Sequence, residues 1–267
     1  MIERYHEAPN SIFKRVQRET DGDYCLAHLY NENKEYRDNF KEAVAKGRKV
    51  ILDNSIFEGK GLSNAEYASL IEDLRPSHYI IPDVLEDRSA TVSNFKTFLE
   101  EFPDLSGIKI GVMQGKNYKD LIACYNSLIH YGADMVAISF DYSYYQIMFP
   151  NIEDKLFAWC QGRSRLIDKM IGDGIIDYNK DHHLLGCSLA KEFSYYHDVR
   201  YSFITSVDTS NPVVAGMFNL KYEIRRGLET KPSMKLCDMI DNKLSQEQEE
   251  LVMYNIEEFK RIAGNEN

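Results

Sequence analysis

Residues 108–140 read IKIGVMQGKNYKDLIACYNSLIHYGADMVAISF, and this stretch decides the fold class. Its first eight residues, through Gly115, are apolar enough for a buried strand. Residues 121–131 then repeat apolar side chains at helical spacing, and residues 134–140 form a second apolar run. A strand, a helix and another strand joined in this way run parallel, because the helix carries the chain back across the sheet. The stretch therefore predicts a parallel βαβ unit.

The same unit recurs along the chain. Further strands are expected at YCLAHL (24–29), VILDN (50–54), HYIIPD (78–83), HHLLG (182–186) and YSFITSVD (201–208), with FNLKYEI (218–224) as a candidate eighth. Capping boxes at Ser63–Glu66 and Ser245–Gln248 mark the starts of two helices.

Seven or eight such units predict an α/β fold, a (β/α)8 TIM barrel. We expect a single domain over residues 1–267 with a C-terminal capping helix near 245–263. A doubly wound open sheet is the alternative, although no G-x-G-x-x-G motif supports a dinucleotide site.

Composition narrows the function classes. The net charge of −10 argues against a generally basic nucleic-acid-binding surface. Three local basic clusters remain, and ordinary solvated surface is an adequate explanation for any one of them. They are Lys14–Arg15–Arg18, Arg163–Arg165–Lys169 and Lys221–Arg225–Arg226–Lys231–Lys235. No apolar run could span a membrane, and five scattered cysteines form no C-x-x-C pair. A reduced, cytoplasmic protein is expected.

Polar side chains stand where the expected strands end. They are Asp53, Asp83, Gln114, Ser139 with Asp141, and Asp208. Any single aspartate here could simply cap the following helix. In a barrel, however, the carboxyl ends of all strands form the mouth of the active site, so these side chains would gather there. An acidic ring that includes an amide suits a divalent metal, a sugar or a polar heterocycle.

A metal site has little support in the sequence. Hard cations need several carboxylates together, and the chain has no H-x-x-x-H pair. Adjacent His182 and His183 would point to opposite faces of a strand. No metal and no cofactor is therefore predicted. Carboxylates can instead perform glycosyl chemistry, one as nucleophile and another moving a proton. A third carboxylate with an amide can read a purine edge, and an aromatic such as Phe57 can stack on its face.

Several segments resemble the tRNA-guanine transglycosylase superfamily in order and spacing. They are VILDNSIF (50–57), YIIPDV (79–84), residues 109–139, HHLLGCSLAKEF (182–193), SFITSVDTS (202–210) and LVMYNIEEFKRIA (251–263). The similarity covers roughly residues 22–263, and the Val-Met-Gln-Gly element with its following helix is the most specific part. It implies a barrel that exchanges guanine in a nucleic acid through a covalent glycosyl–aspartate intermediate.

The resemblance implies a role for each matching residue. Asp208 would be the nucleophile that attacks C1′, and Asp53 would handle the proton of the departing and arriving bases. Asp83 would read the guanidine-like edge of the base. Gln114, followed by Gly115, would contact the carbonyl of the base.

Four further residues complete the predicted site. Phe57 would stack on the base, and Ser139 would belong to the substrate-binding set. Arg225 and Arg226, which follow the last expected strand, would hold the phosphates of the polymer.

The chain also departs from the family pattern. Asn54-Ser55-Ile56 replaces Ser-Gly-Gly, residues 137–140 replace a glycine-rich stretch, and Thr209-Ser210-Asn211 replaces Pro-Thr-Arg. The cysteine zinc motif and the archaeal RNA-binding domain are missing. A short barrel without them looks like the DNA-modifying branch typical of bacteriophages and bacterial DNA-modification islands. The expected partners are DNA, with tRNA as the second choice, and a 7-deazaguanine base.

Two alternatives stay open. One is a non-catalytic relative that binds a base or serves as a partner subunit, although the retained trio of Asp53, Asp83 and Asp208 argues against it. The other is a metal-dependent barrel enzyme such as an aldolase or sugar isomerase, whose activity would require metal and no nucleic acid. The sequence does not decide which 7-deazaguanine is used, which nucleotide context is selected, or whether the chain forms a homo-oligomer or joins a partner protein.

Overall fold

The computed structural model describes residues 2–264. Within them, eight strands follow one another in chain order around a closed barrel, and the recorded strand pairs are parallel. The strands are β1 (Glu3–Tyr5), β2 (Gly22–Leu26), β3 (Lys49–Asp53), β4 (His78–Ile80), β5 (Ile108–Met113), β6 (Met135–Ser139), β7 (Asp181–Leu185) and β8 (Ile204–Asp208). The predicted α/β class and barrel are confirmed.

Helices connect most of the strands. They are α1 (Phe13–Val16), α2 (Ala27–Glu32), α3 (Lys34–Ala45), α4 (Asn64–Leu74), α5 (Arg88–Glu101), α6 (Tyr118–His130), α7 (Ser143–Met148), α8 (Lys155–Gly172), α9 (Asn211–Met217) and α10 (Gln246–Gly264), with short 3-10 turns η1 (Asn10–Ile12), η2 (Ala190–Tyr195), η3 (Val199–Tyr201) and η4 (Leu236–Met239). Both capping boxes are confirmed, because Ser63 and Ser245 exchange hydrogen bonds with the residues three positions on. No helix within residues 2–264 is long and apolar enough to cross a bilayer.

The expected number of seven or eight strands agrees with the eight observed, but the candidate eighth strand was wrong and the first strand was missed. The first strand is Glu3–Tyr5, which the sequence analysis missed, and Tyr5 pairs with Asp208 of β8. The candidate strand at 218–224 is not a strand. Its alternating apolar side chains include Phe218 and Ile224, which are 43% and 70% exposed. Alternation alone therefore does not distinguish a strand from a surface segment with apolar side chains.

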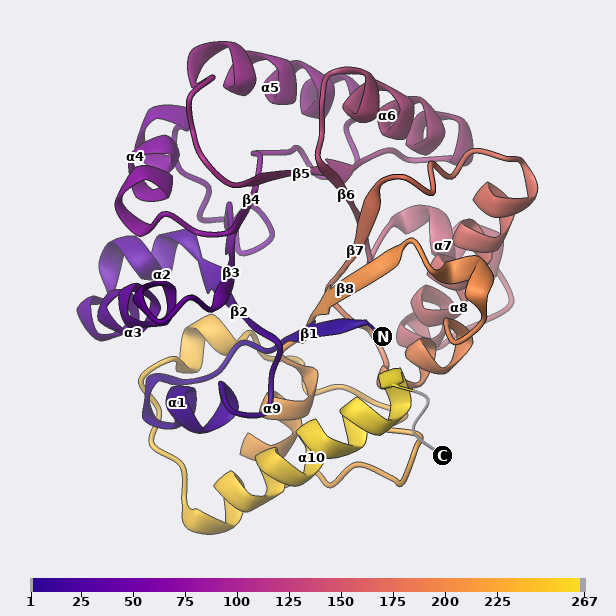
Figure 1. The fold of residues 1–267 in the computed structure, drawn as a ribbon. Coiled ribbons are helices and arrows are strands. Elements are labelled where there is room, and N and C mark those ends of the chain that lie inside the picture. The colour runs from indigo at the N-terminus through magenta and orange to yellow at the C-terminus, as the bar shows by residue number, and fades with distance from the viewer. Residues whose placement is uncertain (1, 265–267) are drawn as a thin grey trace. The chain divides into compact units, whose positions relative to one another are not determined.

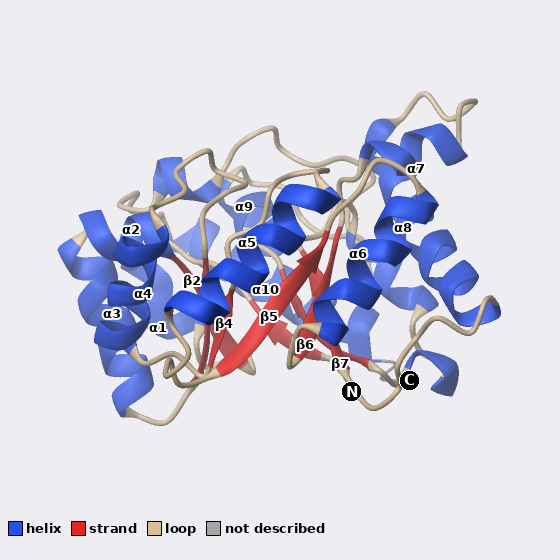
Figure 2. Ribbon diagram, turned by 90° about the horizontal axis from the view of Figure 1, so that it is seen from above, coloured by secondary structure: helices blue, strands red, loops and turns tan. Residues whose placement is uncertain are grey.

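The contacts of the chain divide it into two compact units, and the single domain expected from the sequence stays a prediction. One unit is Gly22–Ile138 and contains β2 to β5 and most of β6. In it, α5 and α6 cover the outer side of β5 (Figure 2). They pack so closely that a side-chain carbon on Gly111 would lie 3.0 Å from Leu128 and 3.1 Å from Phe95. Strands covered in this way read as continuous apolar runs, which is the pattern that the sequence shows.

The other unit contains the chain before Gly22 and from Ser139 onward, with β1, β7 and β8. In it, α10 lies beside α9 and α1 (Figure 1). Val252 and Ile256 of α10 share one apolar cluster with Val213 of α9. The C-terminal helix thus packs on α9, the helix that follows β8 and Asp208.

Candidate active site

Asp208, the predicted nucleophile, is the last residue of β8 and is only 5% exposed. Its Oδ1 accepts hydrogen bonds from Nε2 of His183 at 2.9 Å and from the backbone N–H of Gly186 at 2.8 Å. Within residues 2–264 no group donates to Oδ2. The carboxylate is therefore held through Oδ1, while Oδ2 accepts no hydrogen bond from these residues.

His183 is a site residue that the sequence analysis missed. It lies on β7 beside Ser206 of β8, and its Nδ1 is 2.8 Å from the Ser206 hydroxyl. Because a carboxylate can only accept, we assign the proton to Nε2, and Nδ1 then accepts from the hydroxyl. Both ring nitrogens are thus committed to β8. What brings His183 to Asp208 is the register between β7 and β8, and this register cannot be read from the sequence.

The neighbouring His182 faces the other side of β7, as the alternation of strand side chains predicts. Its Nδ1 donates to the carbonyl of Lys180 at 2.9 Å, and its ring meets that of Phe203 edge-on at 4.8 Å. Burial lowers the pKa of His182 from 6.5 to about 4, despite the opposing effect of the Lys180 carbonyl. His182 is therefore neutral at neutral pH and belongs to the packing of the strand.

A buried ion pair supports the backbone that carries the Gly186 N–H. Arg163 of α8 and Glu192 of η2 are fully buried and form two hydrogen bonds of 2.6 and 2.9 Å. The same guanidinium donates to the carbonyls of Leu185 at 3.0 Å and Gly186 at 2.9 Å. Burial alone would lower the pKa of Arg163, but the Glu192 carboxylate outweighs it and raises that pKa. The solvated-surface explanation was therefore wrong for Arg163.

Gly186 itself has a conformation that favours glycine. Its φ is +67°, and a side-chain carbon there would lie 2.4 Å from the ring of Phe140. The Lys231 ammonium lies 5.1 Å from the centre of that ring and donates to the carbonyl of Cys187 at 3.1 Å. Phe140 and Lys231 thus lie against the loop whose Gly186 N–H donates to Asp208, and neither was a predicted site residue.

Asp53, at the end of β3 in the other unit, is 7% exposed. Its two oxygens accept from the Tyr24 hydroxyl at 2.8 Å and from the Ser55 backbone N–H at 2.6 Å. Ser55 has a φ of +61°, which a non-glycine residue rarely adopts. Its hydroxyl accepts from the His28 backbone N–H at 3.2 Å, which helps to hold this turn. The turn aims the Ser55 amide at Asp53.

Asp83 and Gln114, which are predicted to read the base together, lie in direct contact. The Gln114 amide nitrogen donates to Oδ2 of Asp83 at 2.6 Å, and that of Asn54 donates to Oδ1 at 2.8 Å. The Gln114 carbonyl accepts from the Glu86 backbone N–H at 2.8 Å, which fixes which end of the amide is nitrogen. An amide nitrogen has two hydrogens, so Gln114 keeps one N–H beyond its bond to Asp83.

The remaining predicted substrate residues have different surroundings. Gly115 is buried, and a side-chain carbon there would lie 2.8 Å from both the Asp120 Cβ and the Leu121 backbone nitrogen. It permits the close approach of α6 to the end of β5. The Ser139 hydroxyl donates to Asp141 at 2.7 Å. Phe57 is 45% exposed in the turn after β3.

The predicted phosphate contacts, Arg225 and Arg226, are exposed in a turn after α9 rather than after a strand. The Arg225 backbone N–H donates to the buried carboxylate of Glu258 in α10 at 3.1 Å. A side-chain carbon on Gly227 would lie 2.8 Å from that of Ala190. The turn therefore packs against the loop that follows β7, which is also the loop of Gly186.

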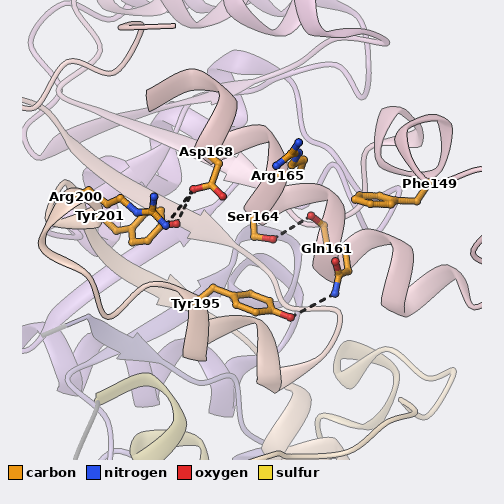
Figure 3. A pocket seen from close by; sticks show the side chains of 8 residues that line it. All are labelled: Phe149, Gln161, Ser164, Arg165, Asp168, Tyr195, Arg200 and Tyr201. Atoms are coloured by element: carbon orange, nitrogen blue, oxygen red, sulfur yellow. Dashed lines mark hydrogen bonds and ion pairs between the residues drawn. The ribbon is translucent and has the colours of Figure 1, made fainter. Parts of the chain in front are cut away.

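A separate pocket of about 270 Å³ lies along α8 in the same unit as Asp208 (Figure 3). Asp168 accepts there from the Tyr201 hydroxyl at 2.6 Å and lies 3.8 Å from Arg200. The Gln161 amide donates to the Tyr195 hydroxyl at 3.4 Å. None of the predicted catalytic residues lines this pocket.

Each unit thus assembles one part of the predicted set. Asp208 has acquired His183 as a partner, while Asp83 and Gln114 contact each other in the other unit. The convergence of all these residues on one pocket stays a prediction.

No family model matches the chain, and no curated protein matches it significantly. Within residues 2–264, no three His, Cys, Asp or Glu side chains are grouped so that they could hold a metal ion.

Proposed function

We propose that this protein is a nucleic-acid guanine transglycosylase that exchanges guanine for a 7-deazaguanine base, in DNA rather than in tRNA. The observation that carries the proposal is the state of the Asp208 carboxylate. It is buried at a strand end, receives two hydrogen bonds at Oδ1 and receives none within residues 2–264 at Oδ2. A carboxylate held in this way can attack a carbon and later depart from it, as a covalent glycosyl intermediate requires.

Barrel topology supports a joint role for the two groups of residues. In a closed parallel barrel, the carboxyl ends of all strands belong to the same end of the barrel. Asp53 ends β3, Asp83 follows β4 and Asp208 ends β8. We therefore propose that all three serve a single substrate.

The proposed reaction has two steps. In the first, Oδ2 of Asp208 attacks C1′ of the guanine nucleotide. The C1′–N9 bond breaks, its electrons leave with guanine, and the departing base takes a proton from Asp53. In the second, the incoming base returns a proton from its N9 to Asp53 and attacks C1′. The C1′–Oδ2 bond then breaks and the Asp208 carboxylate is restored.

Asp83 and Gln114 are suited to select the base. A carboxylate accepts from N1–H and the exocyclic amine of guanine, and the second N–H of Gln114 can donate to the carbonyl. The amides of Asn54 and Gln114 each hold one oxygen of Asp83, so the carboxylate is oriented before a base arrives. A base that lacks these donors would leave the Asp83 carboxylate incompletely paired and would be rejected.

The polymer has to present its base outside the stack, and its backbone then needs a positively charged contact on the protein. We assign this contact to Arg225 and Arg226, which are both exposed. Changing both to Ala should weaken binding to DNA of every sequence. The slope of log K against log salt should become shallower by roughly 0.7–0.9 for each phosphate that the protein no longer neutralises. Arg165→Ala is the matched control, since Arg165 is an exposed arginine in the pocket of Figure 3. An unchanged slope in the double variant would reject this docking surface.

The function itself is tested by incubating the protein with labelled guanine or a 7-deazaguanine and either DNA or tRNA, followed by nucleoside analysis. We expect label in DNA, and none with Asp208→Asn. Label in tRNA alone would keep the reaction and change the polymer. Binding of a base without any exchange would support the base-binding alternative. Activity that requires metal and no nucleic acid would refute the proposal.

A further inference from the structure

We propose that His183 is a positioning residue for the nucleophile, which selects Oδ2 of Asp208 as the attacking atom and assists the second half of the exchange. This inference rests on the proposed function and adds a residue to it. Two donors, His183 Nε2–H and the Gly186 N–H, converge on Oδ1. The lone pairs used by these bonds are unavailable for attack, so the bond to C1′ forms at the other oxygen.

The geometry excludes a direct acid or base role for His183 on the substrate. The side chain is fully buried, and its two nitrogens face Ser206 and Asp208 of β8. The ring of Tyr5 on β1 stands edge-on to it at 6.4 Å. Neither nitrogen can reach a base without breaking a bond to β8, so any effect of His183 on the reaction passes through Asp208.

The two half-reactions should depend differently on His183. The carboxylate loses its charge when it attacks C1′ and recovers that charge when the incoming base displaces it. Hydrogen bonds to a charged oxygen are stronger than those to an ester carbonyl. Donors at Oδ1 therefore favour the step that regenerates the carboxylate, while they do not accelerate the attack.

Removing the donor should consequently make the covalent intermediate accumulate. His183→Leu should slow displacement by about tenfold to a hundredfold, the range expected for a hydrogen bond to a charged group. Release of guanine in a single turnover should change much less. His183→Gln should restore most of the displacement rate, because the amide nitrogen of Gln can occupy the place of Nε2 and donate to Oδ1.

The measurements are the burst of guanine release and the fraction of protein carrying a nucleic-acid adduct at Asp208, found by mass spectrometry after rapid denaturation. His182→Leu is the matched control, because it removes a buried histidine from the same strand without touching Asp208. We expect a raised adduct fraction for His183→Leu and an unchanged one for His182→Leu. If His183→Leu does not fold, Ser206→Ala takes its place, because it removes the hydroxyl that donates to Nδ1 of His183. A raised adduct fraction in Ser206→Ala would then support the role of His183, and an unchanged one would overturn it.

Equal slowing of both half-reactions, or the same result for both histidines, would overturn the role of His183. These outcomes leave the proposed function intact, because the wild-type adduct at Asp208 still forms. A wild-type protein that releases no guanine and forms no adduct with DNA or tRNA would overturn both.

Discussion

The buried pair of Arg163 and Glu192 allows stability and activity to be separated. Arg163→Met removes a guanidinium that is 0% exposed. Within residues 2–264, the Glu192 carboxylate then keeps one side-chain donor, the Tyr196 hydroxyl at 2.7 Å. Removing one partner of a buried ion pair costs about 3–5 kcal/mol. Against a total stability of about 5–15 kcal/mol, this is a large loss. The midpoint of thermal unfolding should fall by roughly 6–20 °C for a chain of this size.

A double variant tests the cause of that loss. In Arg163→Met with Glu192→Leu, no buried charge is left without a partner, so most of the stability should return. The carbonyls of Leu185 and Gly186 still lack their donors, at a cost of about 1 kcal/mol each. The free energies of unfolding come from urea titrations of the wild type, of Arg163→Met, of Glu192→Leu and of the double variant.

Activity should not return with stability. The guanidinium is what fixes the loop from which Gly186 donates to Asp208, and the double variant does not replace it. We expect exchange to stay at least tenfold below wild type in a protein that is nearly as stable. The reasoning fails if the two stability losses simply add, or if the double variant regains full exchange activity.

Three further predictions concern single residues. Asp208→Asn should abolish the covalent adduct and reduce exchange by orders of magnitude while base binding survives, as measured by adduct analysis and by calorimetry with the free base. Asp83→Asn should weaken binding and base selectivity first, because it places a donor where guanine also donates, and competition between bases would show this. His182→Asn should flatten the loss of stability in acid. The pKa of His182 is about 4 in the folded protein and 6.5 in the unfolded chain, so the unfolded chain binds a proton first as the pH falls. The stability of the wild type therefore decreases between about pH 6.5 and pH 4, by about 3 kcal/mol in total. The free energy of unfolding is measured at pH 7 and pH 5 for the wild type and for His182→Asn. An equal loss of stability between the two pH values in both proteins would contradict this prediction.

The sequence predicted the elements of the barrel wherever periodicity was strong. The βαβ unit at 108–140 and the capping box at Ser63 have their expected structure. The sequence could not predict β1, because three residues with a charged start carry no periodic signal. The segment 218–224, offered as a candidate eighth strand, is not a strand. That segment is fixed by a distant residue, since Asn255 of α10 bonds to the backbone of Tyr222.

In the predicted site, too, residues whose position depends on local structure could be predicted, and partners that are distant in the sequence could not. The acids at strand ends could be read directly, because their position depends on local structure. The partner of Asp208 could not, since His183 lies 25 positions away in the sequence and reaches it through the register of two strands. Arg163 was assigned to a solvated cluster because charge patterns along a sequence do not reveal burial. Long-range pairing is therefore where the sequence analysis failed.

The surroundings of the aspartates argue for their different proposed roles. Asp83 receives a side-chain amide at each oxygen, so both oxygens are oriented but neither is set apart for attack. Asp208 receives both of its donors at one oxygen, and this asymmetry leaves a single atom for bond formation. A carboxylate that reads hydrogen bonds gains from two fixed oxygens, whereas a nucleophile needs one fixed and one available. If the roles were reversed, the bond to C1′ would form at an Asp83 oxygen that an amide already holds, and Asp208 would offer only Oδ2 to the donors of guanine.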